Sequence, residues 1–298
     1  MADLISGAAP TSEAGIPAVG LTLAARTPKE LPLGGAGAMA AGSPESSEAL
    51  LYLHGWAGSK ELWWSSLREM SGWSYGVALD LPGTGETPAA EEPSSMADMA
   101  RWVADMCARL GLKSVTLVGH SLGGNLAAQV ALDHPRIVRR LVLVDAALDT
   151  ASLPKRAFWS LSPHYGMHAL KLARLASEPI AALGRRTPDD HQGGPLLALA
   201  RRTRLYLDKN RDIDLQQQMR WLCENPLPAE DLSAIAAPVL WIHGVRDLTI
   251  PITHAREIVR ELPHWTLHAM PGADHSPMDH DPEGFARIIR RFCQEKQS

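Results

Sequence analysis

Ser121 stands in a sequence pattern typical of a catalytic nucleophile. The residues Gly119-His120-Ser121-Leu122-Gly123 match G-x-S-x-G, preceded by the apolar run VTLVG and followed by the helix-forming run LGGNLAAQVAL. Such a sharp strand-to-helix turn lifts the serine oxygen clear of the backbone, and its two glycines remove Cβ atoms that would collide. The pattern predicts a nucleophilic serine. The alternative is a glycine-rich turn with an unreactive serine.

A serine hydroxyl needs a base near neutral pH, and the base needs an acid that orients it. We call the turn Gly119–Gly123 the elbow. In proteins with this nucleophile elbow the chain order is serine, acid, histidine. Asp247 follows the apolar run PVLWIHG, and His275 lies in a loop after the next predicted strand, HWTLHAM. We predict Ser121, Asp247 and His275 as nucleophile, acid and base. Asp145, which ends the run LVLVD, is the alternative acid, and His280 is the alternative base.

Three other histidines have structural interpretations. His120 lies inside the elbow, so we expect its side chain to point away from the serine oxygen. His243 ends a predicted strand, where we expect it to be packed. His54 precedes a glycine at another strand end and is expected to shape that loop.

An acyl-transfer reaction also needs hydrogen-bond donors for the oxyanion. The backbone N–H of Leu122, which follows the nucleophile, is the first candidate. The N–H of Trp56, in the loop after the strand-like run LLYLHG, is the second. The Trp56 side chain is also expected to line the substrate pocket. The two roles are compatible, because one uses the backbone N–H and the other uses the indole.

Apolar strands alternate with amphipathic helices along most of the chain, which predicts a mainly parallel sheet covered by helices on both faces. The alternation is absent between about residues 150 and 236. We therefore predict a loose N-terminal arm at 1–28, a core formed by 29–149 and 237–298, and an inserted helical cap at 150–236. From Lys155 to Arg211 the cap carries 11 Lys and Arg against 4 Asp and Glu.

Composition places the chain among ordinary soluble globular proteins. Its 298 residues are 45% hydrophobic and 21% charged, with a formal net charge of −4, so nucleic acid is not an expected partner. No apolar run approaches the roughly 18 residues that span a bilayer. The first residues lack the basic and apolar regions of a secretory signal. Three widely separated cysteines indicate a reducing compartment, and we predict a cytoplasmic protein.

Neither a metal nor a cofactor is predicted. The sequence lacks H-E-x-x-H and C-x-x-C spacings, which are typical of metal or redox sites. The segment GTGETP is glycine-rich but lacks the lysine of a phosphate-binding loop, and VGHSLGG does not match the dinucleotide-binding pattern.

The motifs together resemble those of the α/β-hydrolase superfamily. The matching pieces are LHGWAGS, ALDLPGTGET, VGHSLGGNLA, VLWIHGVRD and GADHSPMDHDPEGF, between about residues 49 and 293. The resemblance implies the α/β-hydrolase fold, with Ser121, Asp247 and His275 as the triad. The HGW loop, the DLPG turn, the ADMA helix and the helical cap are similar to those of the carboxylesterase branch, including the pimeloyl-carrier-protein methyl ester esterases.

This resemblance implies a serine hydrolase that cleaves carboxylic esters, or thioesters, through an acyl-enzyme. Acyl transfer, carbon–carbon bond hydrolysis with the same triad, and an inactive binding module are the alternatives. The substrate is expected to be a small-molecule ester, free or bound to an acyl carrier protein. In the related esterases, basic cap residues hold the acidic carrier. The cap arginines here either do the same or form a solvated basic face; they are Arg185, Arg186, Arg201, Arg202 and Arg204.

Overall fold

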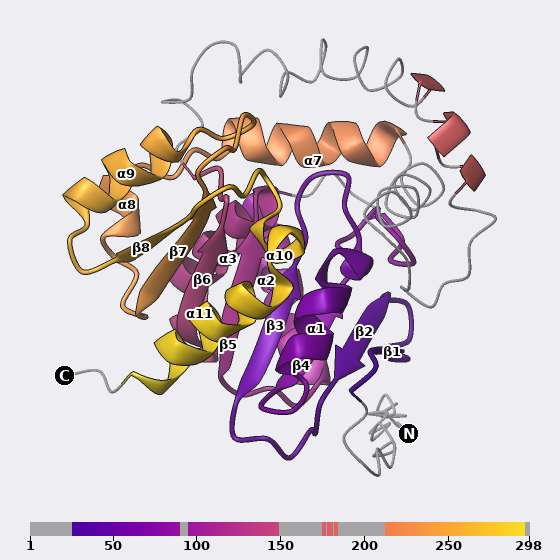
Figure 1. The fold of residues 1–298 in the computed structure, drawn as a ribbon. Coiled ribbons are helices and arrows are strands. Elements are labelled where there is room, and N and C mark those ends of the chain that lie inside the picture. Colours follow the sequence, from indigo (N-terminus) through magenta and orange to yellow (C-terminus); the bar gives the residue numbers. More distant parts are fainter. Residues whose placement is uncertain are drawn as a thin grey trace, which may run out of the picture.

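An eight-stranded, mostly parallel sheet forms the centre of the molecule (Figure 1). The computed structural model describes residues 26–89, 95–148, 175–176, 178–180, 182–183 and 212–295. The strand order is β1-β2-β4-β3-β5-β6-β7-β8. The first two strands pair antiparallel and the other six run parallel. The strands are β1 (Lys29–Glu30), β2 (Ala38–Ala41), β3 (Ala49–Leu53), β4 (Tyr75–Leu79), β5 (Val115–His120), β6 (Val138–Val144), β7 (Val239–Gly244) and β8 (Thr266–Met270).

Helices cover both faces of this sheet, as the sequence predicts. The described helices are η1 (Lys60–Trp63), α1 (Trp64–Met70), α2 (Met96–Arg109), α3 (Leu122–Asp133), η2 (Pro135–Ile137), α7 (Asp212–Glu224), α8 (Ala229–Leu232), α9 (Ile252–Glu261), α10 (Pro277–His280) and α11 (Pro282–Gln294). Helices α1 and α11 pack together on one face, and α2 and α3 pack together on the other (Figure 1). The predicted layered α/β architecture is confirmed.

Alternate residues of each strand supply the two hydrophobic cores. In β3, Leu51 and Leu53 join the core under α2 and α3, whereas Leu50 and Tyr52 join the core under α1 and α11. Successive strand residues point to opposite faces, and both faces here are covered. This explains why the strands are continuous apolar runs rather than alternating polar and apolar residues.

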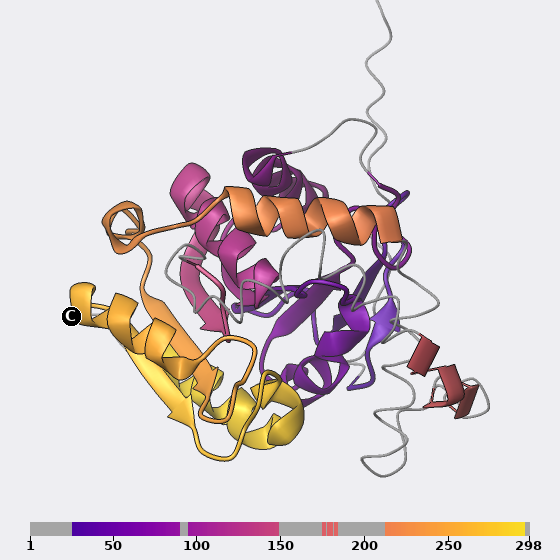
Figure 2. The ribbon, with the colours of Figure 1, turned by 90° about the horizontal axis from the view of Figure 1, so that it is seen from above.

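Part of the predicted cap lies within the described residues. Helix α7 passes over the edge of the sheet at which the parallel strands end, on the side of α3 (Figures 1 and 2). Most of residues 150–211, with the five cap arginines, lies outside the described residues, as does most of the predicted arm at 1–28. The division into arm, core and cap therefore stays a prediction.

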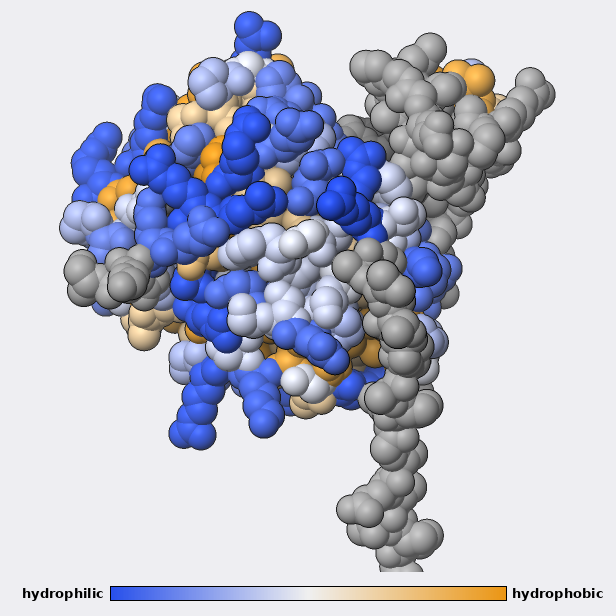
Figure 3. Space-filling view, turned by 60° about the horizontal axis from the view of Figure 1, so that its bottom comes forward, coloured by the Kyte–Doolittle hydropathy of each residue, from blue (hydrophilic) through white to orange (hydrophobic). Residues whose placement is uncertain are grey.

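The opposite edge, where the parallel strands begin, carries mostly hydrophilic residues with small, separate apolar patches (Figure 3). Within the described ranges, no helix has the length and apolar character needed to cross a membrane.

Candidate active site

Ser121 occupies the strained turn between β5 and α3. Its φ of 53° and ψ of −118° place a non-glycine residue in a region that costs on the order of 1–3 kcal/mol. The Ser121 N–H donates to the Val144 carbonyl at 2.9 Å, which ties the turn to β6. A Cβ on Gly119 would lie 2.2 Å from the Gly123 carbonyl oxygen, and one on Gly123 would lie 2.4 Å from the His54 carbonyl oxygen. The predicted need for both glycines is confirmed.

Asp247 and His275 form a hydrogen-bonded pair next to this turn. His275 Nδ1 lies 2.7 Å from Asp247 Oδ2. The other carboxylate oxygen accepts from the backbone N–H groups of Thr249 at 2.8 Å and Ile250 at 2.9 Å. Burial alone would raise the pKa of Asp247, but the hydrogen bond and charge of His275 outweigh it and lower the pKa. An ionised Asp247 therefore holds the proton of His275 on Nδ1, which leaves Nε2 free to accept another.

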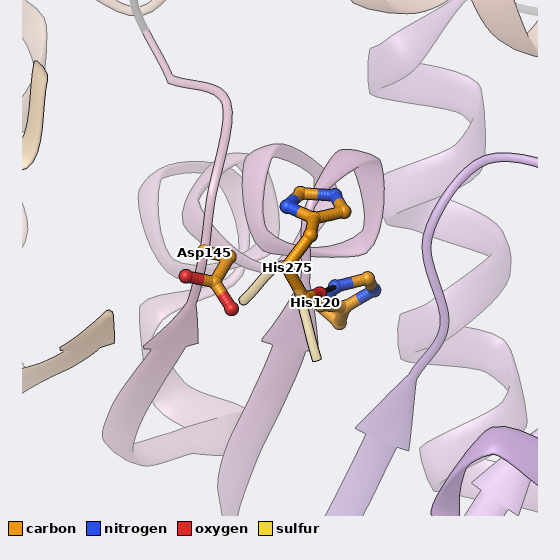
Figure 4. A group of neighbouring side chains, drawn as sticks. All are labelled: His120, Asp145 and His275. Carbon is orange, nitrogen blue, oxygen red and sulfur yellow. Dashed lines mark hydrogen bonds between the residues drawn. The ribbon is translucent and has the colours of Figure 1, made fainter. Parts of the chain in front are cut away.

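His120 holds the backbone of His275 beside the elbow, a contact that the sequence does not reveal. His120 Nε2 donates to the His275 carbonyl at 2.8 Å, and the two rings lie 4.8 Å apart (Figure 4). The other side of the His120 ring meets Trp63 edge-on at 6.5 Å. Burial and the neighbouring His275 lower the pKa of His120 to about 3. A neutral His120, the residue before Ser121, thus connects the elbow to the loop that carries His275.

Asp145, the alternative acid, directly follows β6 but is not the hydrogen-bond partner of His275. It is fully buried, with a φ of 44°, and its Oδ1 accepts from the Gly244 N–H at 2.8 Å. Figure 4 shows it on the strand next to the one that carries His120. Burial and the charge of Asp247 raise the pKa of Asp145 to about 9. Asp145 is therefore a protonated acid near neutral pH.

Neither His243 nor His280 forms a hydrogen bond with Asp247, although His243 Nε2 lies 3.6 Å from Asp247 Oδ2. His243 is fully buried, and its Nε2 donates to the Ile250 carbonyl at 2.9 Å, so the predicted packing role is confirmed. Burial lowers the pKa of His243. His280 lies in α10 and lines a groove between β8 and α11.

Two groups of side chains in the described part of the chain bring possible metal-binding atoms within 4.8 Å of one another. They are His120 with Asp145 and His275, and Asp145 with His243 and Asp247. The hydrogen bonds described above already use an atom of each of these five residues. This arrangement suits a proton-transfer network. The prediction that no metal is needed stays a prediction.

The loop after β3 lies against the elbow. A Cβ on Gly55 would lie 3.0 Å from the Ser121 Cβ. His54 fixes the loop, since its Nδ1 donates to the Gly55 carbonyl at 2.8 Å and its Nε2 accepts from the Leu81 N–H at 3.0 Å. The predicted loop-shaping role of His54 is confirmed. Leu122 is the first residue of α3, so its N–H has no partner within the helix.

A buried ion pair supports the same loop from below. The Lys60 side chain is fully buried, and its Nζ donates to Asp80 Oδ2 at 3.0 Å and to Glu86 Oε2 at 3.2 Å. The Lys60 N–H also donates to Asp80 Oδ1 at 2.7 Å. Burial alone would lower the pKa of Lys60, but the carboxylates around it, Asp80 foremost, raise it. The pair fixes the end of the loop to β4.

Two contacts connect the cap region to the elbow, and the sequence does not reveal either. The Trp56 indole Nε1 donates to the Leu215 carbonyl in α7 at 2.8 Å. Asn125, one turn after Ser121 and fully buried, donates from Nδ2 to the carbonyls of Ala147, Leu148 and Asn225 at 3.0, 3.2 and 3.2 Å. Asn125 thus joins the chain leaving the core for the cap to the chain returning from it.

This fold and these motifs define a known class of protein. The model of the alpha/beta hydrolase fold family matches residues 48–282, and the chain belongs to that family. A hydrolase from Pseudomonas aeruginosa PA01 has the same fold, with a TM-score of 0.69 at 22% identity over 90% of this chain and 98% of that one.

Curated relatives confirm the predicted resemblance. The pimeloyl-[acyl-carrier protein] methyl ester esterase of Nitrosomonas europaea is 30% identical over 240 residues, which cover 79% of this chain and 92% of the esterase. An uncharacterized protein of Mycobacterium tuberculosis is 29% identical over 267 residues, which cover 83% of this chain and 75% of that protein.

Proposed function

We propose that the protein hydrolyses carboxylic esters or thioesters through an acyl-enzyme formed on Ser121. One observation carries the proposal: a serine in a left-handed backbone conformation at the start of α3, tied through His120 to a 2.7 Å Asp247–His275 pair. Backbone strain of this kind is typical of functional sites. If this position only had to form a turn, glycine would adopt the conformation without strain. A strained serine here therefore indicates that the side chain is needed.

In the proposed reaction, His275 Nε2 takes the Ser121 hydroxyl proton while the serine oxygen attacks the ester carbonyl. The ionised Asp247 stabilises the imidazolium that forms. The N–H groups of Leu122 and Trp56 donate to the oxyanion, and each such donor contributes on the order of 3 kcal/mol in the transition state. The alcohol or thiol leaves with the proton from His275. Water then attacks the acyl carbon with His275 again acting as base; the bond to Ser121 Oγ breaks, the acid leaves, and His275 returns the proton to the serine oxygen.

The proposed substrate class comes from the relatives. The Nitrosomonas europaea protein is named for a methyl ester carried on an acyl carrier protein. By analogy, we propose that the substrate of this chain is a small-molecule ester, either free or bound to a carrier protein. The Trp56 indole, half-buried between the elbow loop and α7, is the proposed wall of the substrate pocket.

The direct test is covalent labelling with a fluorophosphonate, which reacts with activated serines. The wild-type protein should be labelled on Ser121, and Ser121→Ala should lose both label and esterase activity. Ser66→Ala is the matched control, because Ser66 is also buried but lies in α1; it should keep both. Labelling of Ser121→Ala at wild-type level, or its retention of more than about a hundredth of wild-type kcat, would contradict the proposed nucleophile.

A further inference from the structure

Gln218, in the middle of α7, has an unusual environment for a glutamine. Its side chain is completely buried. Among the residues that the structure describes, neither its Nε2 nor its Oε1 has a hydrogen-bond partner. Burying an amide without partners is unfavourable, so such a group indicates a ligand, a trapped water or a functional constraint.

Two anchors place Gln218 relative to the elbow. The Leu215 carbonyl, three residues earlier, accepts from the Trp56 indole at 2.8 Å. The Asn225 carbonyl, just beyond the end of α7, accepts from Asn125 at 3.2 Å. Trp56 follows Gly55, on which a Cβ would lie 3.0 Å from the Ser121 Cβ, and Asn125 lies one turn after Ser121. Gln218 therefore lies between two points of α7 that are both tied to the surroundings of Ser121.

The spacing along α7 also places Gln218 on the buried face of the helix. Leu215, Gln218, Met219 and Leu222 follow the i, i+3, i+4, i+7 pattern of one helix face. Leu215 packs against Trp56 and Ala57, and Met219 and Leu222 belong to the core that contains α3. Figures 1 and 2 show α7 passing over this end of the sheet. The face that carries the amide is thus turned toward the loop after β3 and the core that contains α3, and not toward solvent.

We propose that Gln218 is a substrate-binding residue that recognises a neutral hydrogen-bonding group, an amide or a hydroxyl, near the scissile ester. This inference rests on the proposed esterase function. A primary amide both donates and accepts, which matches an amide or hydroxyl better than an alkyl chain. A charged group is disfavoured there, because burying an unpaired ion is far more costly than burying a neutral polar group. The other residues of this helix face are apolar, and small-molecule sites usually combine an apolar lining with a few polar groups.

The test uses two p-nitrophenyl esters with acyl chains of equal heavy-atom number, one with an internal amide and one purely alkyl. Gln218→Met keeps the length of the side chain and removes its hydrogen bonds. For this variant, kcat/KM for the amide ester should fall at least tenfold, while that for the alkyl ester should stay within threefold or rise. Gln216→Met is the matched control, because Gln216 lies on the same helix but is only half-buried; it should change neither value.

A second measurement does not depend on catalysis. Gln218→Met should raise the thermal unfolding temperature of the free protein, because it removes a buried amide without partners. Calorimetry can also compare the binding of the two product acids, one with the amide and one alkyl, to Ser121→Ala with and without Gln218→Met. This repeats the comparison of the two acyl chains without turnover. Activity in Ser121→Ala would refute the proposed nucleophile but leave the Gln218 comparison valid.

Three results would overturn the role of Gln218. Equal losses on the two esters would assign it a purely structural role. A lower unfolding temperature in Gln218→Met would show that the amide is satisfied in the free protein, by water or by the chain. Equal binding of the two product acids by proteins with Gln218 and with Met at this position would exclude recognition.

Discussion

Asp145→Asn should make the protein's stability less dependent on pH. A free aspartate has a pKa of about 3.9, whereas burial and the charge of Asp247 raise the pKa of Asp145 to about 9. Between these values the folded protein holds a proton that the unfolded chain has released. The contribution of Asp145 to the free energy of unfolding is therefore fully present below pH 4 and is lost as the pH rises toward 9. Asparagine stays neutral throughout and keeps an oxygen for the Gly244 N–H.

The expected size follows from linkage. Each proton held only by the folded state changes the free energy of unfolding by about 1.4 kcal/mol per pH unit. Between pH 6 and pH 8 the wild-type protein should thus lose about 3 kcal/mol relative to Asp145→Asn. His54, His120 and His243 have lowered pKa values and act in the opposite direction as the pH falls through about 6.5. They are present in both proteins, so most of their contribution cancels in the difference; His243, whose Nε2 lies 3.5 Å from Asp145 Oδ1, is in contact with the substituted residue.

The assay is urea unfolding of both proteins at half-unit steps from pH 6 to pH 8, with the free energies compared at each pH. The difference should grow steadily in favour of the variant. Parallel curves would refute the reasoning, because they would mean that Asp145 is ionised in the folded protein. A difference that grows in favour of the wild type would have the wrong sign and refute it as well.

Three further predictions concern the site and its cap. Asp247→Asn should lower kcat by about 10⁴-fold through the wrong imidazole tautomer, whereas Asp145→Asn should stay within tenfold of wild type; steady-state kinetics that reverse this order would make Asp145 the acid. Asn125→Leu removes the donor shared by three carbonyls and should lower the free energy of unfolding by about 1–3 kcal/mol; wild-type stability in urea unfolding would show that these hydrogen bonds do not stabilise the fold. Replacing Arg201, Arg202 and Arg204 with Ala should raise KM for a carrier-bound ester and weaken its salt dependence, with a small neutral ester as control; equal effects on the two esters would favour the solvated-face interpretation.

Local sequence was sufficient to predict the fold and the elbow. The elbow motif lies within five consecutive positions, and the clash that Gly119 avoids is with Gly123 itself, whereas the clash that Gly123 avoids is with the distant His54 carbonyl. The parallel strands are recognisable because burial on both faces requires continuous apolar runs. His275 and two candidate acids, Asp247 and Asp145, could be named because the carboxyl ends of parallel strands meet at one edge of the sheet.

Only the tertiary structure decided which carboxyl group pairs with His275. Asp145 and Asp247 both follow neighbouring strands of one sheet, so their positions in the chain do not distinguish them. The loop after β8 brings His275 within 2.7 Å of Asp247, while burial and then the charge of Asp247 raise the pKa of Asp145. The bonds from Asn125 to Asn225 and from Trp56 to Leu215 join residues 100 and 159 positions apart. Contacts at such separations leave no periodic signal in the sequence, because each depends on how a whole helix is placed. The burial of the Gln218 amide likewise results from how α7 packs. Its neighbours Gln216 and Gln217 are also glutamines but are less buried.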